Sequence, residues 1–93
     1  MIPSEVTLLQ LTRQVRIRYP DATYTLDGYT LRCHSPSAEH RHAPKPVSPN
    51  VTVTQIEPVG NYAVKFIFDD GHRTGLYRWE WLRELCTAHG KSQ

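Results

Sequence analysis

Apolar side chains occupy every second position of the segment 14–19, with polar or basic side chains between them. This period of two residues is typical of a strand that buries one face. A turn at residues 20–22 leads to the run 23–26, which is expected to return as the partner strand of a hairpin. An earlier strand is expected at 6–9. A short turn-like or one-turn helical passage should follow at 27–32, where a glycine lowers the helix propensity.

The second half of the chain centres on a strongly apolar strand at 62–68, which ends in three consecutive apolar residues. Its loose alternation is typical of a central strand covered on much of both faces. Gly60-Asn61 separates this strand from the run 51–56 and predicts a two-residue hairpin turn with positive φ. Asp70-Gly71 predicts a second turn at the other end of the strand, and a short third strand is expected at 74–77.

Helical spacing begins at Arg78. Over residues 78–85 the tryptophans and leucines gather toward one side, while the arginines and glutamates face water. Trp79 and Trp81 are expected to belong to the core rather than to a binding surface, because a small domain needs large apolar anchors.

The two halves of the chain resemble each other. The segment 15–21 aligns without a gap with 64–70, and a Leu-Arg pair follows at 31–32 and again at 82–83. The implied unit is a strand, an acidic turn, a return strand and a short helix. One such unit cannot bury its apolar face alone, so the two are expected to pack together. Residues 1–93 are therefore predicted to form one α+β domain of antiparallel β-hairpins in two similar units, with one C-terminal helix packed on the sheet.

Composition narrows the classes of function. The 93 residues include 22% charged residues and carry a formal net charge of +2. The sequence has no basic stripe of the kind that binds nucleic acid, and no apolar stretch long enough to span a bilayer. The first residues lack the basic and apolar regions of a secretory signal, so a cytoplasmic location is expected. In that reducing compartment Cys33 and Cys86 should be thiols rather than a disulfide.

The segment 35–50 is the least regular part of the chain. Its four prolines preclude a regular helix through most of it and predict an exposed, extended loop. Such a loop can be a plain connector between the two halves. It can also carry a contact, because loops carry function more often than cores do.

Three segments of the sequence resemble those of a widespread family of small bacterial proteins of unknown function. They are Ser-Pro-Ser-Ala-Glu at 35–39, Ile-Glu-Pro-Val-Gly-Asn-Tyr-Ala-Val at 56–64, and the segment from Phe68 to Trp79. That family is similar to the N-terminal domain of γ-butyrobetaine hydroxylase and trimethyllysine hydroxylase, and the resemblance covers nearly the whole chain. Domains of this kind also occur fused to P-loop ATPases implicated in iron–sulfur cluster carriage. The resemblance implies an accessory domain, because the iron-binding catalytic domain of the hydroxylases would begin where this chain ends.

The resemblance also implies a position for a metal. In the hydroxylases the domain holds zinc through three cysteines and a histidine, and the aligned positions here are Ser35, Ser37, His40 and His72. Serine is a poor zinc ligand at neutral pH, and tetrahedral zinc needs four strong ligands. A rebuilt site for zinc or iron would use Cys33, His40, His42 and His72. The alternative is that His72 is a turn residue whose imidazole hydrogen-bonds the backbone of the neighbouring loop.

The residues themselves give no catalytic constellation. Cys33 and His34 are neighbours that point to opposite faces of an extended chain, and the acidic pair before Gly71 suits a turn better than acid–base chemistry. The predicted function is a non-enzymatic accessory or protein-interaction domain that binds an unidentified protein partner through the segment 35–50 and the turn at 70–72. A small zinc- or iron-binding protein is the alternative, and an oxygenase subunit is a distant third. The sequence does not specify the oligomeric state.

Overall fold

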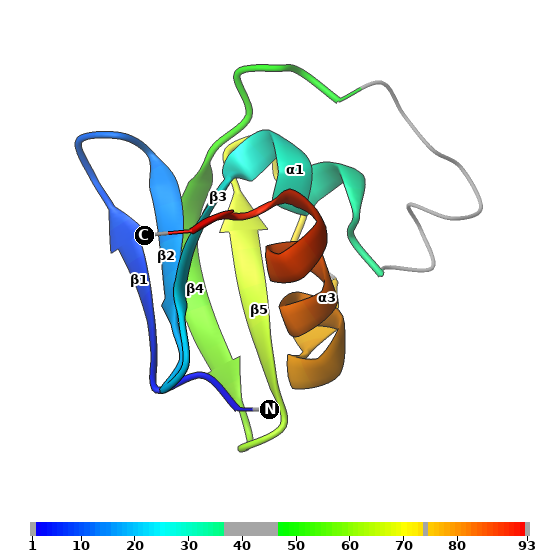
Figure 1. Ribbon diagram of the computed structural model, residues 1–93. Helices are drawn as coiled ribbons and strands as arrows, with labels where there is room; N and C mark the ends of the chain where they lie inside the picture. The colour runs from blue at the N-terminus through cyan, green and yellow to red at the C-terminus, as the bar shows by residue number, and fades with distance from the viewer. Residues whose placement is uncertain (1, 37–46, 74, 93) are drawn as a thin grey trace.

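The computed structural model describes residues 2–36, 47–73 and 75–92. Two antiparallel sheets and two helices make up the described fold, which is α+β as predicted (Figure 1). The elements, in chain order, are β1 (Glu5–Leu9), β2 (Gln14–Arg18), β3 (Thr23–Asp27), α1 (Gly28–Cys33), β4 (Val53–Val59), β5 (Ala63–Phe68), β6 (Leu76–Arg78), α3 (Trp79–His89) and β7 (Lys91–Ser92).

The internal repeat predicted from the sequence appears in the order of the elements. Three antiparallel strands and a helix occur twice, first as β1-β2-β3-α1 and then as β4-β5-β6-α3. The first sheet has the order β1-β2-β3-β7 and the second the order β4-β5-β6. After α3 the chain crosses to the first sheet, where β7 pairs with β3 (Figure 1). The C-terminal strand therefore ties the second unit to the first.

The core lies between the two units and takes side chains from both. The aligned leucines of the repeat, Leu31 and Leu82, are both completely buried. Their neighbours in the core come from β2, β3, β4, β5, β6 and both helices, and the largest completely buried side chain of the described residues is Tyr77. Burial of this shared apolar surface is the main stabilising contribution available to a chain of this size. Neither unit could supply it alone.

The turn after β4 differs from the predicted one by a residue. Gly60 has the expected positive φ of 54°, but the loop spans residues 60–62 because β5 begins at Ala63. Trp79 explains the extra residue: its backbone N–H donates to the Tyr62 carbonyl at 3.2 Å, and its indole Nε1 donates to the Asn61 carbonyl at 2.7 Å. The loop is therefore held by a residue of α3 that lies far away in the sequence.

The structure selects the helical one of the two forms expected for residues 27–32, and it lengthens the C-terminal helix. The passage 27–32 forms a true helix, α1, because the Asp27 side chain accepts a hydrogen bond from the Thr30 backbone N–H at 2.7 Å and caps its first turn. Helix α3 continues to His89, four residues beyond the predicted end at 85. Trp79 and Trp81 are half-buried and pack against the core, as predicted.

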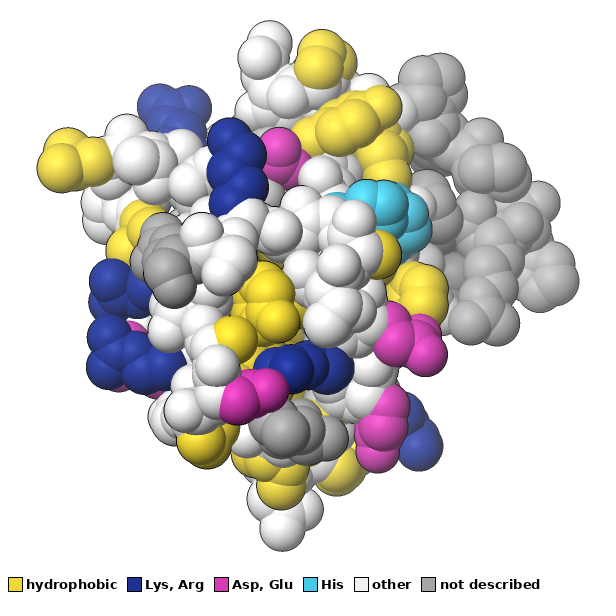
Figure 2. Space-filling model, in the orientation of Figure 1, with side chains coloured by type: hydrophobic (Ala, Val, Ile, Leu, Met, Phe, Trp, Pro, Cys, Tyr) yellow, Lys and Arg dark blue, Asp and Glu magenta, His cyan; other side chains and the backbone are white. Residues whose placement is uncertain are grey.

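The third strand of the second unit, β6, begins at Leu76, whereas the sequence favoured a start at Thr74, which lies outside the described residues. Within the described residues, no helix has the length and apolar character needed to cross a membrane. Figure 2 shows basic and acidic side chains interspersed on the viewed face rather than gathered in one basic stripe, in line with the small net charge.

Candidate functional site

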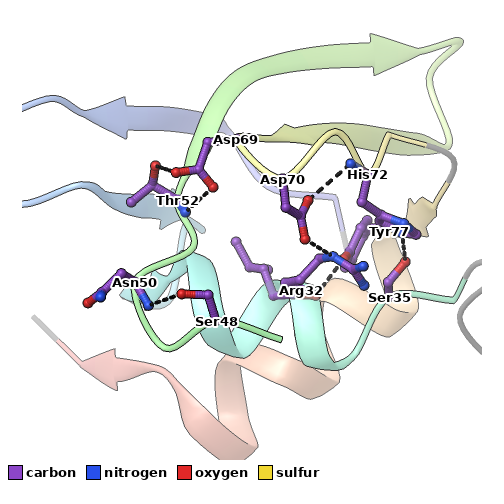
Figure 3. Close-up of polar contacts among 10 residues, drawn as sticks. Arg32, Ser35, Ser48, Asn50, Thr52, Asp69, Asp70, His72 and Tyr77 are labelled. Atoms are coloured by element: carbon purple, nitrogen blue, oxygen red, sulfur yellow. Dashed lines mark hydrogen bonds and ion pairs between the residues drawn. The ribbon is translucent and has the colours of Figure 1, made fainter. Parts of the chain in front are cut away.

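A cluster of four polar residues joins the end of α1 to the turn between β5 and β6 (Figure 3). We call it the Arg32–His72 cluster, and its members are Arg32, Ser35, Asp70 and His72. Three of them are buried: Arg32 is 8% exposed, Ser35 5% and His72 9%. Buried polar side chains need partners, because an unpaired one costs free energy. The cluster supplies such partners across the two units of the repeat.

Asp70 is the charged centre of this cluster. One carboxylate oxygen accepts a hydrogen bond from Arg32 Nε at 2.8 Å, and the other accepts from the His72 backbone N–H at 3.0 Å. Partial burial acts to raise the pKa of Asp70, but these two hydrogen bonds and the positive charge of Arg32 outweigh it and lower the pKa below the ordinary value of 3.8. Asp70 is therefore ionised at neutral pH and bound to Arg32.

His72 contacts Ser35 on the other side of the cluster. Its Nε2 lies 2.8 Å from the Ser35 hydroxyl, and both side chains are buried. Gly75 packs on the same hydroxyl so closely that a Cβ at position 75 would collide with it. The sequence alternative in which the His72 imidazole hydrogen-bonds the neighbouring loop matches this contact, although the partner is a side chain rather than the backbone.

A groove of about 610 Å³ lies beside the cluster, between the segment after α1 and strand β6. We call it the β6 groove, and it is lined by Cys33, His34, Ser35, Pro36, Leu76, Arg78 and Trp81. Leu76 is 43% exposed, so its side chain adds accessible apolar surface to this groove. The groove therefore offers apolar surface together with a basic side chain.

Helix α3 and the end of α1 hold one wall of the groove in place. Trp81 Nε1 donates to the His34 carbonyl at 2.9 Å, and His34 Nδ1 lies 2.9 Å from the Thr30 carbonyl. The His34 ring also lies 6.5 Å from the Trp81 ring and 4.7 Å from the His89 ring, measured between centroids. Sequence reasoning missed this wall, because it joins residues from two helices that lie far apart in the chain.

Comparison with known proteins places the chain in a family. Residues 6–83 match the model of the gamma-butyrobetaine hydroxylase-like N-terminal domain. The protein belongs to this family. Among solved structures, a protein of unknown function of the DUF971 family from Acidithiobacillus ferrooxidans is 36% identical, with a TM-score of 0.75, and the match covers 89% of this chain and 90% of that one. A protein solved by NMR in solution is 42% identical, with a TM-score of 0.77 over 92% of this chain and 73% of that one. A search of curated proteins finds no match.

Two of the four metal ligands proposed for this hydroxylase-like domain lie in the described structure. Cys33 and His72 are described, whereas His40 and His42 lie outside the described residues, as does Ser37. The part of the chain that the structure describes contains no group of three or more His, Cys, Asp or Glu side chains suited to a metal ion. The donors that meet at the aligned positions, the Ser35 hydroxyl and the His72 imidazole, do not by themselves fit zinc. The four-residue set stays a prediction.

The two cysteines of the hydroxylase-like domain are thiols rather than a disulfide, as predicted. Cys86 is completely buried, and burial raises its pKa to about 11, so the thiol is protonated at neutral pH. Cys33 is half-buried at the rim of the β6 groove. Cys86 therefore serves packing, and Cys33 is the thiol beside the candidate site.

Ser35→Ala is expected to lower the free energy of unfolding by about 1 kcal/mol, because it removes a buried hydrogen-bond partner of His72. Urea unfolding at neutral pH would measure the loss. Ser48→Ala is the matched control, since the Ser48 hydroxyl takes part in one hydrogen bond at an exposed site, where it accepts from the Asn50 backbone N–H. Equal losses in the two variants would contradict a stabilising contact between Ser35 and His72.

Proposed function

We propose that this protein is a non-catalytic interaction domain that binds a partner protein through the β6 groove. The observation that carries the proposal is the composition of the groove, in which exposed Leu76 and half-buried Trp81 lie beside Arg78. Apolar and aromatic side chains with a nearby arginine are the typical centre of a protein-binding surface.

The contact surface that we propose is narrower than the one expected from the sequence. Of the predicted turn at 70–72, Asp70 is engaged by Arg32, and His72 is buried against Ser35. Their polar atoms therefore hold the fold together. Pro36 belongs to the predicted loop 35–50 and also lines the groove, so the proposal keeps the beginning of that loop.

Three chemically competent side chains near the groove support a non-catalytic role, whereas Cys33 and His34 both line the groove itself, since Cys33 belongs to helix α1 rather than to an extended chain. His72 bonds to Ser35, Asp70 is bound to Arg32, and Cys86 is a buried, protonated thiol. A general base or nucleophile must reach a substrate proton or a reactive atom. These groups instead contact one another or the core.

The family description supports a partner of a particular kind. It places related domains at the N-terminus of hydroxylase-like proteins, and the resemblance seen in the sequence extends to domains fused to P-loop ATPases of iron–sulfur carriage. We therefore propose a cytoplasmic partner of the oxygenase or iron–sulfur carrier class.

Site-specific photo-crosslinking tests this function. A photoreactive side chain in place of Leu76 is expected to link one protein from a cell of the source organism, which mass spectrometry would identify as an oxygenase or an iron–sulfur carrier. The control replaces Leu11, which is fully exposed on the loop between β1 and β2. The same products at both positions, or none at position 76, would count against the proposal.

Elemental analysis separates the proposal from the rival metal-binding function. The interaction domain is expected to purify without stoichiometric zinc or iron, and its thermal midpoint should not change when a chelator is added. A metal site built from Cys33, His40, His42 and His72 would give about one equivalent of metal and a lower midpoint with chelator, because bound metal stabilises the folded state. Both effects would then disappear in His72→Ala.

A further inference from the structure

We infer that strand β6 accepts an extended acidic segment of the partner protein as an additional strand, with its apolar side chains in the β6 groove. This inference rests on the proposed function and specifies how the partner is recognised. Strand β6 is the last strand in the described order β4-β5-β6, so its outer edge faces away from β5. Addition of a strand to such an edge is a recurring mode of peptide recognition.

The pairing register shows which backbone groups of β6 point outward. The N–H of Trp79 donates to the Tyr62 carbonyl, and the next pairs in register are Arg78 with Ala63 and Tyr77 with Val64. In an antiparallel pair every second residue exchanges hydrogen bonds with its partner, and the residues between direct their N–H and C=O groups outward. Tyr77 therefore bonds to β5, whereas the backbone groups of Leu76 and Arg78 face the outer edge of β6.

The outward groups of β6 are few but well defined. Leu76 contributes an N–H and a carbonyl, and Arg78 contributes its N–H. The Arg78 carbonyl is committed elsewhere, because this residue is the N-cap of α3 and begins the hydrogen bonds of the helix. An added strand can thus form a short ladder at Leu76 and Arg78.

The side chains of the same two residues line the groove that such a strand would cross. Leu76 and Arg78 point to the face opposite Tyr77, which is completely buried. Together with Trp81 and Pro36 they form the groove walls. An incoming strand would place alternate side chains on this face, so an apolar side chain would contact Leu76 and Trp81.

The positive charge of Arg78 favours a partner segment with an acidic side chain. The ion pairs among the described residues involve four other basic side chains: Arg16, Arg32, Lys65 and Arg83. Arg78 has no carboxylate partner within the described ranges, and its guanidinium lies 5.7 Å from the centroid of the exposed Tyr62 ring. It is also the N-cap of α3 without a side-chain capping hydrogen bond, so the positive end of that helix lies beside it. Glu80 already places a carboxylate in the first turn of α3, so a carboxylate of the partner, two positions from the apolar residue, would meet the Arg78 guanidinium.

A random-peptide display selection against the full chain, followed by synthesis of the enriched peptides, tests the inference. Enriched peptides are expected to share an acidic residue two positions from an apolar one. Their binding would be followed by tryptophan fluorescence in the Trp79→Phe background, where Trp81 in the groove is the remaining indole.

Two variants at Arg78 separate the contribution of charge from that of the backbone. Arg78→Gln removes the charge and is expected to weaken peptide binding roughly fivefold. Arg78→Pro also removes the outward N–H, and proline fits there because φ of Arg78 is −61°. It should weaken binding by roughly a further fivefold. The control is Lys91→Gln in the short strand β7, which removes one charge from the other sheet and should leave binding unchanged.

The inference is overturned if no peptide is enriched, if the enriched peptides lack an acidic residue, or if Arg78→Pro binds as well as Arg78→Gln. Self-association of the chain that Arg78→Pro abolishes would also overturn it, since the edge would then bind a second copy. Failure of strand addition can be distinguished from failure of the proposed function. A partner that crosslinks at position 76 in the Arg78→Pro variant as well would preserve the interaction domain and exclude only strand addition.

Discussion

Gly28→Ala is expected to lower the free energy of unfolding by about 2 kcal/mol, although alanine is the better helix former. A Cβ at position 28 would lie 2.6 Å from the Val51 carbonyl oxygen and 2.8 Å from Thr52 Cα. Both are backbone atoms, so neither can move aside by changing a rotamer. Overpacking of this kind costs about 1 to 3 kcal/mol, and the gain in helix propensity returns at most about 1 kcal/mol. The clash therefore outweighs the gain in helix propensity, and the substitution lowers the free energy of unfolding.

Urea or thermal unfolding of Gly28→Ala beside Tyr29→Ala would measure this effect. Tyr29 follows in the same turn of α1, and its side chain is 42% exposed, so its removal should cost less. A stabilised Gly28→Ala protein would mean that α1 can move away from the segment 51–52. The link between the first helix and the second unit would then be looser than the structure implies.

Gly28 also illustrates how far the sequence could predict the fold. The strand pattern was recovered because the alternation in β2 and the apolar run in β5 are local signals. The glycine was interpreted only through its low helix propensity. Its actual role, close contact with backbone around residue 51, is set by the packing of the two units and cannot be seen in a window of neighbouring residues.

The candidate site also combines features that the sequence predicted with features that depend on packing between the two units. The resemblance singled out Ser35 and His72 as aligned positions, and the structure brings these two side chains together at 2.8 Å. Asp70 was predicted as a turn residue and as part of a contact surface for a partner, and Trp81 only as a core residue. Their further roles, in the pair with Arg32 and in the wall of the β6 groove, depend on contacts between the two halves of the repeat. No sequence period encodes such contacts.

Asp70→Asn is expected to lower the free energy of unfolding by about 2 kcal/mol at neutral pH. Removing one partner of a fully buried ion pair costs about 3 to 5 kcal/mol. The expected loss is smaller here because the pair is not fully buried. The Arg32 side chain is 9% exposed, but the Asp70 side chain is 33% exposed. Asp21→Asn is the control. The Asp21 carboxylate lies 2.8 Å from the Arg83 guanidinium, but the Asp21 side chain is 51% exposed, so a smaller loss of unfolding free energy is expected.

The pH dependence provides an independent readout of the Asp70 pair. Because folding lowers the pKa of Asp70, its contribution to stability is fully present above the unfolded value near 3.8 and is lost as the pH falls through the lower folded value. The asparagine side chain of the variant cannot titrate in this way, so the difference in unfolding free energy between the two proteins should shrink in acid. A difference that stayed constant from neutral pH into strong acid would mean that the substitution disturbs packing rather than the ion pair, and that the charge of Asp70 does not hold the two units together.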